Sequence, residues 1–201
     1  MERDYYHSID SFKFIAVACF MFFVFGISGE VGDVVRYCLS FAVPFLYMTF
    51  GFIILGEDED QSGIIARSIG RNLAVFGVSI IAFSGISLIY LRMNGIELVF
   101  TAKSIIDFLV FGKWQLPVGT LVWFCEQLVI ALVFFFILSK LKLLRHRWFV
   151  NMLLLLTLAV NLVFGEFSRL FGLGYLPNCF FNSAIPFMLF GKVIKDHEEQ
   201  V

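Results

Sequence analysis

Two groups of side chains in this sequence have the types and spacing to do chemistry. Arg67 and Arg71 are four residues apart, so on a helix they share one face and can bind the same anionic oxygens, such as those of a phosphate. Glu126 and Gln127 are neighbours within an otherwise apolar run. A carboxyl group in such a run is costly unless it faces a partner or water, so we expect Glu126 to point into the protein.

Each group also has a structural interpretation. Arg67 and Arg71 could serve as basic anchors against anionic lipid at a membrane surface. Burial favours the neutral form of a carboxyl group, which would let Glu126 handle protons. A protonated Glu126 that is hydrogen-bonded to a neighbouring helix fits the sequence at least as well.

Long runs without charge must position these groups. Residues 37–56 carry no charged side chain, and the chain of 201 residues is 60% hydrophobic with 27 phenylalanines. A bilayer core about 30 Å thick needs on the order of 20 apolar residues as helix, because only a helix or a closed barrel satisfies its own backbone hydrogen bonds there. The runs have helical length and do not alternate, so we expect an all-α, polytopic transmembrane helical bundle.

We predict one integral membrane domain, residues 1–201, with six spans and without an internal repeat. The spans are residues 14–29, 37–56, 72–91, 114–139, 148–165 and 170–191. Pro44 and Pro186 fall inside two of them, where the missing backbone hydrogen bond predicts a kink that suits either a pocket or ordinary packing. Asn161 and Asn178 are more typical of hydrogen bonds between membrane helices than of ligands.

Residues 96–111, between the third and fourth spans, have a different pattern. Glu97, Thr101, Ser104 and Asp107 recur at steps of three or four, which puts them on one helical face. We predict an interfacial amphipathic helix at the outer surface. A short re-entrant segment fits the pattern equally well.

The distribution of Lys and Arg predicts the orientation in the membrane. If the N-terminus is inside, ten of these 15 residues fall on the cytoplasmic side and five on the other side. The loop SKLKLLRHR, residues 139–147, contributes most. Basic loops stay in the cytoplasm, so we expect both termini there, with the opposite orientation as the alternative. The first span follows a charged segment and lacks a cleavage site, which indicates a retained helix and not a signal peptide.

The cysteines and the acidic run indicate no metal site. The four cysteines, Cys19, Cys38, Cys125 and Cys179, share no ligand spacing, so we interpret them as packing residues, although Cys38 and Cys179 could meet near the outer ends of spans. The run GEDEDQSG, residues 56–63, indicates a solvated turn. We expect no bound metal and no bound cofactor, and a net charge of −1 disfavours nucleic acid as a partner.

Short motifs occur in a set order along the chain. In IDSFKFIAVACFMFFVF, residues 9–25, an acidic and a basic residue precede a long aliphatic run, and this segment resembles the first helix of the membrane acyltransferase 3 family. VPFLYMTFGFII, residues 43–54, resembles its second helix. Arg67 and Arg71 match an Arg-x-x-x-Arg pattern at the cytoplasmic entrance of its third helix.

Two further motifs follow in the same order. LVWF, residues 121–124, resembles the Trp–Phe motif of the family's fourth helix. PNCFFNSAIPFMLFGKVI, residues 177–194, is similar to the Asn-x-x-Phe, Pro-Phe and Gly stretch of its sixth helix. The resemblance therefore covers nearly the whole chain, and its order and spacing are more specific than any single motif.

The resemblance implies a bacterial inner-membrane protein of the cell envelope. Such proteins transfer an acyl group, for example acetyl, from cytoplasmic acyl-CoA to a polysaccharide or a peptidoglycan precursor. On this chain the resemblance implies that Arg67 and Arg71 bind the phosphates of acyl-CoA as co-substrate. It also implies that Trp123 and Asn178 line the pocket.

The chain departs from the family in two ways. The family's catalytic histidine would fall on Val24 or Phe25, neither of which can take a proton from a sugar hydroxyl. The histidines that are present, His7, His146 and His197, lie elsewhere. Glu126 is our candidate for a substitute base. The family also has about ten spans, of which the first six are predicted here.

Three functions remain open from the sequence. The first is an acyl-CoA-dependent O-acyltransferase. The second is a non-catalytic or truncated relative that acts as a membrane partner subunit, with a second copy or another membrane protein covering its open side. The third is a small membrane transporter, which would need charged residues along a path through the lipid bilayer.

Overall fold

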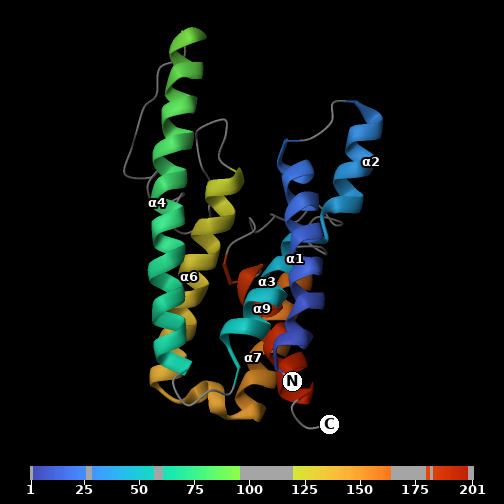
Figure 1. Ribbon diagram of the computed structural model, residues 1–201, viewed down its shortest axis with the longest axis vertical. Coiled ribbons are helices and arrows are strands. Elements are labelled where there is room, and N and C mark those ends of the chain that lie inside the picture. The colour runs from blue at the N-terminus through green and yellow to red at the C-terminus, as the bar shows by residue number, and fades with distance from the viewer. Residues whose placement is uncertain are drawn as a thin grey trace. The chain divides into compact units, whose positions relative to one another are not determined.

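The structure is a computed structural model that describes residues 2–25, 29–56, 61–95, 120–163, 180–181 and 183–198. Helix accounts for about 90% of this part of the chain, and no strand occurs in it. The helices are α1 (Glu2–Phe25), α2 (Glu30–Leu39), α3 (Ala42–Ile54), α4 (Gln61–Met93), α6 (Thr120–Lys140), the 3-10 helix η1 (Leu143–Arg145), α7 (Arg147–Val160) and α9 (Ala184–Glu198) (Figure 1). The prediction of an all-α fold is thus confirmed for the described residues.

Two of the described helices are long and apolar enough to cross a membrane, judged by length and composition. They are α4, with 33 residues, and the stretch Val122–Lys140 of α6, with 19 residues. These helices contain most of the third and fourth predicted spans. Shorter apolar helices cover Lys13–Phe23, Ala42–Ile54 and Arg147–Val163.

The predicted spans differ from the helices mainly at their ends. The helix that holds the first predicted span begins at Glu2, and the helix that holds the third begins at Gln61. The sixth predicted span is described as helix only from Ala184, and that helix continues to Glu198. Hydropathy marks only the apolar part of a helix, whereas the backbone hydrogen bonds continue into its polar turns. The predicted amphipathic helix, residues 96–111, lies outside the described residues.

Pro44 and Pro186 do not lie deep inside a described helix, where the predicted kinks would have formed. Each proline is the third residue of its helix, α3 or α9, where a backbone N–H has no partner within the helix. Deeper in a helix, Pro44 would have lost a hydrogen bond to the carbonyl of Ser40 and clashed with it. The chain instead ends α2 at Leu39, so the second predicted span is divided into two helices.

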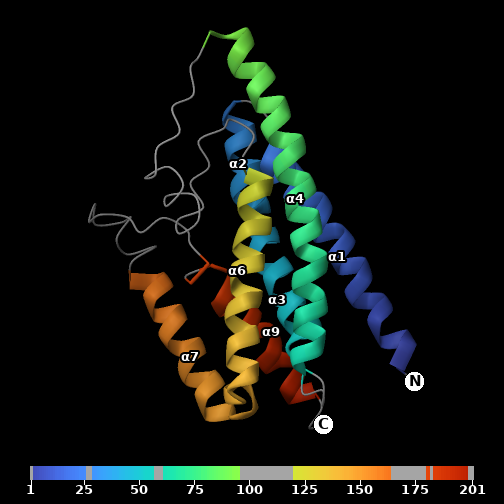
Figure 2. The ribbon, with the colours of Figure 1, turned by 90° about the vertical axis from the view of Figure 1, so that its left-hand side faces the viewer.

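The chain divides into two compact units, which we describe separately. The first combines residues 1–57 with 187–201, and the second covers residues 58–186. In the first unit, α2 and α3 both pack against α1. In the second, α4 lies along α6, and α7 follows after η1 (Figure 2).

In the first unit, α3 and α9 touch at two glycines. A Cβ atom added at Gly51 would overlap the carbonyl group of Met188. One added at Gly191 would overlap the carbonyl group of Met48. The two backbones are therefore in direct contact, as small residues permit in many pairs of membrane helices.

The substitution Gly51→Ala adds this Cβ atom, so we expect it to destabilise the protein by about 1–3 kcal/mol through overpacking. Gly77 of α4 is a matched control, because a Cβ atom added there meets nothing within 4 Å. Gly77→Ala should stabilise by up to about 1 kcal/mol through helix propensity. Thermal unfolding of the detergent-purified protein, followed by circular dichroism, measures both changes. Equal changes in stability for Gly51→Ala and Gly77→Ala would contradict the close contact between Gly51 and Met188.

Candidate functional site

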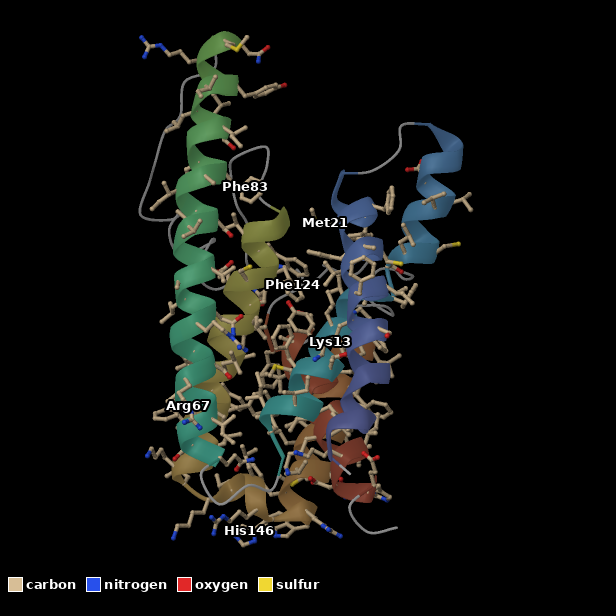
Figure 3. The ribbon with its side chains drawn as sticks, in the orientation of Figure 1. Lys13, Met21, Arg67, Phe83, Phe124 and His146 are labelled. Carbon is tan, nitrogen blue, oxygen red and sulfur yellow. The ribbon has the colours of Figure 1, made fainter. Side chains whose placement is uncertain are left out.

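Basic side chains gather at one end of the second unit. Ser139 at the end of α6 donates a hydrogen bond of 3.4 Å to Oε1 of Gln61 at the start of α4, so the two helices run in opposite directions. Figure 3 shows Arg67 and His146 toward this end of the unit. The exposed cationic side chains of α6, η1 and α7 at this end, which we call the basic end, are Lys140, Lys142, Arg145 and Arg147.

Arg67 and Arg71 lie on α4 some distance inward from the basic end. Both side chains are exposed, and α4 is continuous through both, so they share a helix face as predicted. At 1.5 Å per residue they stand roughly 9 and 15 Å from Gln61 along the helix axis. By the same rise, the apolar residues 129–133 of α6 lie at the level of the two arginines.

Glu126 and Gln127 are buried in α6, with 2% and 0% of their surface exposed. Glu126 therefore points into the protein, as expected. Both carboxyl oxygens of Glu126 and both amide atoms of Gln127 lack a hydrogen-bond partner within the described part of the chain. Leaving one of these buried polar groups without a hydrogen bond costs about 1–3 kcal/mol of folding free energy. The presence of the pair is therefore not explained by a contribution to stability. Trp123 lies one turn away and is half-buried.

The helix face that carries Glu126 opens toward the basic end. Glu126, Val133 and Ile137 recur at steps of seven and four, so they lie on one face of α6. Exposure along this face rises from 2% at Glu126 to 42% at Val133 and 53% at Ile137. By the rise of the helices, Arg71 and Glu126 are offset by only roughly 5 Å along the α4–α6 pair.

The first unit contains a buried ion pair that the sequence did not lead us to expect. Lys192 Nζ lies 2.9 Å from Asp196 Oδ1, and the two side chains are 1% and 8% exposed. Both residues belong to α9, so the pair does not connect two helices. The i, i+4 spacing of opposite charges was the available signal. Lys195 places its ammonium group against Gly56, beyond the C-terminus of α3, where the helix dipole favours a cation.

The predicted position of the family's catalytic histidine lies at the end of α1. Val24 and Phe25 are the last two residues of that helix. His146 is exposed at the start of α7, and His197 is exposed in the last turn of α9. Within the second unit, His146 follows the end of α6 and so does not lie on the face of α6 that carries Glu126.

The remaining candidates do not add to this site. Cys19, Cys38 and Cys125 are free thiols. No group of three His, Cys, Asp or Glu residues that could hold a metal ion occurs among the described residues. Asn178, Cys179 and the acidic residues 57–60 lie outside the described part of the chain.

Comparisons of the chain with protein-family models, curated proteins and solved structures gave no significant match. In its described residues the structure is all-helical and has two helices of membrane-spanning length. The most distinctive chemical feature of this part of the chain is the buried Glu126–Gln127 pair, which has no hydrogen-bond partner among the described residues.

Removing one partner of the buried ion pair should be costly. Asp196→Ala leaves the Lys192 ammonium group buried without its partner, so we expect a loss of about 3–5 kcal/mol. The double substitution Lys192→Met with Asp196→Ala removes both charges and should lie within about 1 kcal/mol of the wild type. Unfolding of single and double variants in one detergent measures the difference. If the double variant lost as much free energy of unfolding as the sum of the losses from the two single substitutions, the pair would not be buried and coupled.

The unpartnered carboxyl group should reduce stability. Glu126→Leu removes the desolvation cost, so we expect it to stabilise the protein by about 1–3 kcal/mol in the absence of a ligand. Leu128→Ala, two residues away and equally buried, should instead destabilise by about 2–5 kcal/mol. The unfolding temperatures of the two variants test this. A loss of stability in Glu126→Leu would show that the carboxyl group has a partner.

Proposed function

We propose that this protein is an acyl-CoA-dependent O-acyltransferase of the membrane, related to the acyltransferase 3 family. It transfers an acyl group, such as acetyl, to a hydroxyl group of a cell-envelope carbohydrate, either a polysaccharide or a peptidoglycan precursor. The observation that carries the proposal is the buried, unpartnered Glu126–Gln127 pair, on a helix face that opens toward the basic end. The motif resemblance across the chain supports the same activity.

The proposed topology is that of six spans in a bacterial inner membrane with both termini in the cytoplasm. The basic end then lies on the cytoplasmic side, because Lys- and Arg-rich loops are retained there. Acyl-CoA is a cytoplasmic metabolite, so this orientation puts Arg67 and Arg71 on the side from which it arrives. Their exposure and common helix face suit the binding of its phosphates.

Glu126 acts as the general base in this proposal. The acceptor hydroxyl oxygen attacks the thioester carbonyl carbon while Glu126 takes the hydroxyl proton. The carbon–sulfur bond then breaks, and the proton passes to the departing thiolate, which restores Glu126. Gln127 would orient the reacting groups with its unpartnered amide, and Trp123, one turn away, would line the pocket together with Asn178.

The exposed surface of α4 favours a second candidate, a membrane partner subunit without catalytic activity. Only 6% of the most apolar part of α4 is buried, against 56% for α6. Val78 and Ile81 are 68% and 76% exposed. Such a helix contacts lipid or packs against another membrane protein, either a second copy or a different subunit.

Calorimetric titration of the detergent-purified protein with acetyl-CoA and with coenzyme A tests the phosphate-binding role. Arg67→Ala and Arg71→Ala should each weaken binding about tenfold or more, because each removes charge-assisted hydrogen bonds. Arg92→Ala, near the opposite end of α4, is the matched control and should bind as the wild type does. If the folded wild-type protein binds neither ligand, the partner-subunit function becomes the better account.

The role of Glu126 requires a separate variant. Glu126→Gln keeps the size of the side chain but cannot accept the proton, so we expect normal acetyl-CoA binding and a transfer rate lowered about 10²–10⁴-fold. Transfer of radiolabelled acetyl groups to isolated envelope carbohydrate measures the rate. Unchanged transfer by Glu126→Gln would remove Glu126 from the mechanism.

A further inference from the structure

The turn between α6 and α7 has a well-defined backbone. The N–H of Lys142 donates a hydrogen bond of 2.9 Å to the carbonyl of Ser139, and the N–H of Arg145 donates one of 3.3 Å to the carbonyl of Lys142. The 3-10 helix η1 packs against both α6 and α7, and Leu144 within it is only 2% exposed. The side chains of the basic end are therefore displayed from a fixed turn.

Large apolar side chains are interleaved with the cations of the basic end. Leu141 stands between Lys140 and Lys142 in the sequence, and Trp148 directly follows Arg147. Leu141 and Trp148 are 63% and 67% exposed. Tryptophan is enriched where lipid headgroups meet hydrocarbon, and Lys and Arg place their charge in the headgroup layer while their stems cover apolar surface. The mixture of side chains therefore suits the headgroup region of a bilayer.

The electrostatics of the turn favour an anion. Glu126 is the only acidic residue in the described part of the second unit, and it stands roughly 21 Å from Lys140 along the axis of α6. The first turn of α7 contains Arg147 and no acidic residue, although the positive end of a helix dipole favours acidic side chains. An anionic group close to this turn would offset the concentration of positive charge.

The backbone of Lys142 carries strain. Its φ of 58° and ψ of 15° are left-handed, and it is the only residue other than glycine with a positive φ among those that the structure describes. Helices commonly end on a glycine in this conformation, because a Cβ atom makes it unfavourable. The chain instead keeps a cation at this position. Strain that is retained in this way points to a function of the side chain.

We propose that the basic end docks the headgroup of an anionic phospholipid from the surrounding bilayer, such as phosphatidylglycerol. Lys142 and Arg145 bind its phosphate through charge-assisted hydrogen bonds. Leu141 and Trp148 contact the glycerol region and the first part of the acyl chains. Basic segments next to a membrane helix are attracted to anionic lipid in this way. The inference rests on the proposed membrane location but not on acyl transfer.

The retention of lipid by the detergent-purified full chain tests the proposal. Native mass spectrometry counts the lipids that remain bound after titration with phosphatidylglycerol or with phosphatidylcholine of the same acyl chains. We expect the wild type to bind phosphatidylglycerol at least tenfold more tightly, because only this headgroup carries a net negative charge. Equal affinities for the two lipids would overturn the proposal, and this comparison needs no variant to fold.

Three single variants locate the site. Lys142→Gly and Arg145→Gln each remove one cation from the basic end and should weaken the binding of phosphatidylglycerol about fivefold. Arg92→Gln removes one exposed cation near the opposite end of α4 and is the matched control, which should bind as the wild type does. An equal loss in all three variants would overturn the proposal, because it would reflect net charge and not a site.

Lys142→Gly also separates lipid binding from a structural role. Glycine adopts the left-handed conformation without strain, so the unfolding temperature should equal or exceed that of the wild type while lipid affinity falls. A parallel fall in both would show that Lys142 supports the turn and would overturn its role in binding.

A last comparison distinguishes a lipid headgroup from a soluble anion. A lipid uses the apolar side chains as well as the cations, so Trp148→Ala should weaken the binding of phosphatidylglycerol about fivefold or more. Inorganic phosphate at the same concentration should not displace the lipid. Displacement by inorganic phosphate, together with unchanged binding by Trp148→Ala, would identify a site for a soluble anion and overturn the proposal.

Discussion

A carboxyl group inside an apolar helix cannot face hydrocarbon, and this constraint on Glu126 governs the second unit. The helix that carries it, α6, is the more buried of the two described helices of membrane-spanning length, whereas few residues in the most apolar part of α4 are buried. The cover over Glu126 ends within two turns, since Val133 on the same face is already 42% exposed. The protein thus keeps the polar pair enclosed, on a helix face whose exposure increases toward the basic end.

Exposed cationic side chains distinguish the basic end of the second unit. The turn from α6 through η1 into α7 concentrates exposed Lys and Arg residues, and α4 adds Arg67 and Arg71 further inward. In the first unit, cations near the end of α3 are instead held close to protein, as the burial of Lys192 and the contact of Lys195 with Gly56 show. Exposed cations can bind a ligand from solution, so the arginines of α4 are better placed for this than Lys192.

Much of the fold could be predicted because its physical causes are local. Long apolar runs predict helices in any sequence that must satisfy its backbone without water, and both long helices were found in this way. The burial of Glu126 followed from the cost of exposing it to lipid. The start of α4 at Gln61 could not be found by hydropathy, because polar turns continue the same hydrogen-bonding pattern. A count of apolar residues likewise could not detect that Pro44 lies in the first turn of a helix, after a break that divides a predicted span.

Other features depend on partners that are distant in the sequence. Gly51 looks like any other glycine in an apolar run until Met188 is placed against it, whereas Gly77 has no such neighbour. The pair of Lys192 and Asp196 looked like a polar helix end because only the structure shows that it is buried. The absence of partners around Glu126 and Gln127 also required coordinates, although the residues themselves were identified from the sequence.

The most direct test of the account is to determine which side of the membrane the basic end faces. Arg145→Cys, in a variant whose native cysteines are replaced by serine, places one exposed thiol at this end. A membrane-impermeant maleimide should label this thiol in inverted inner-membrane vesicles and leave it unlabelled in intact spheroplasts. Labelling only in spheroplasts would put Arg67 and Arg71 on the side without acyl-CoA and contradict the proposed activity.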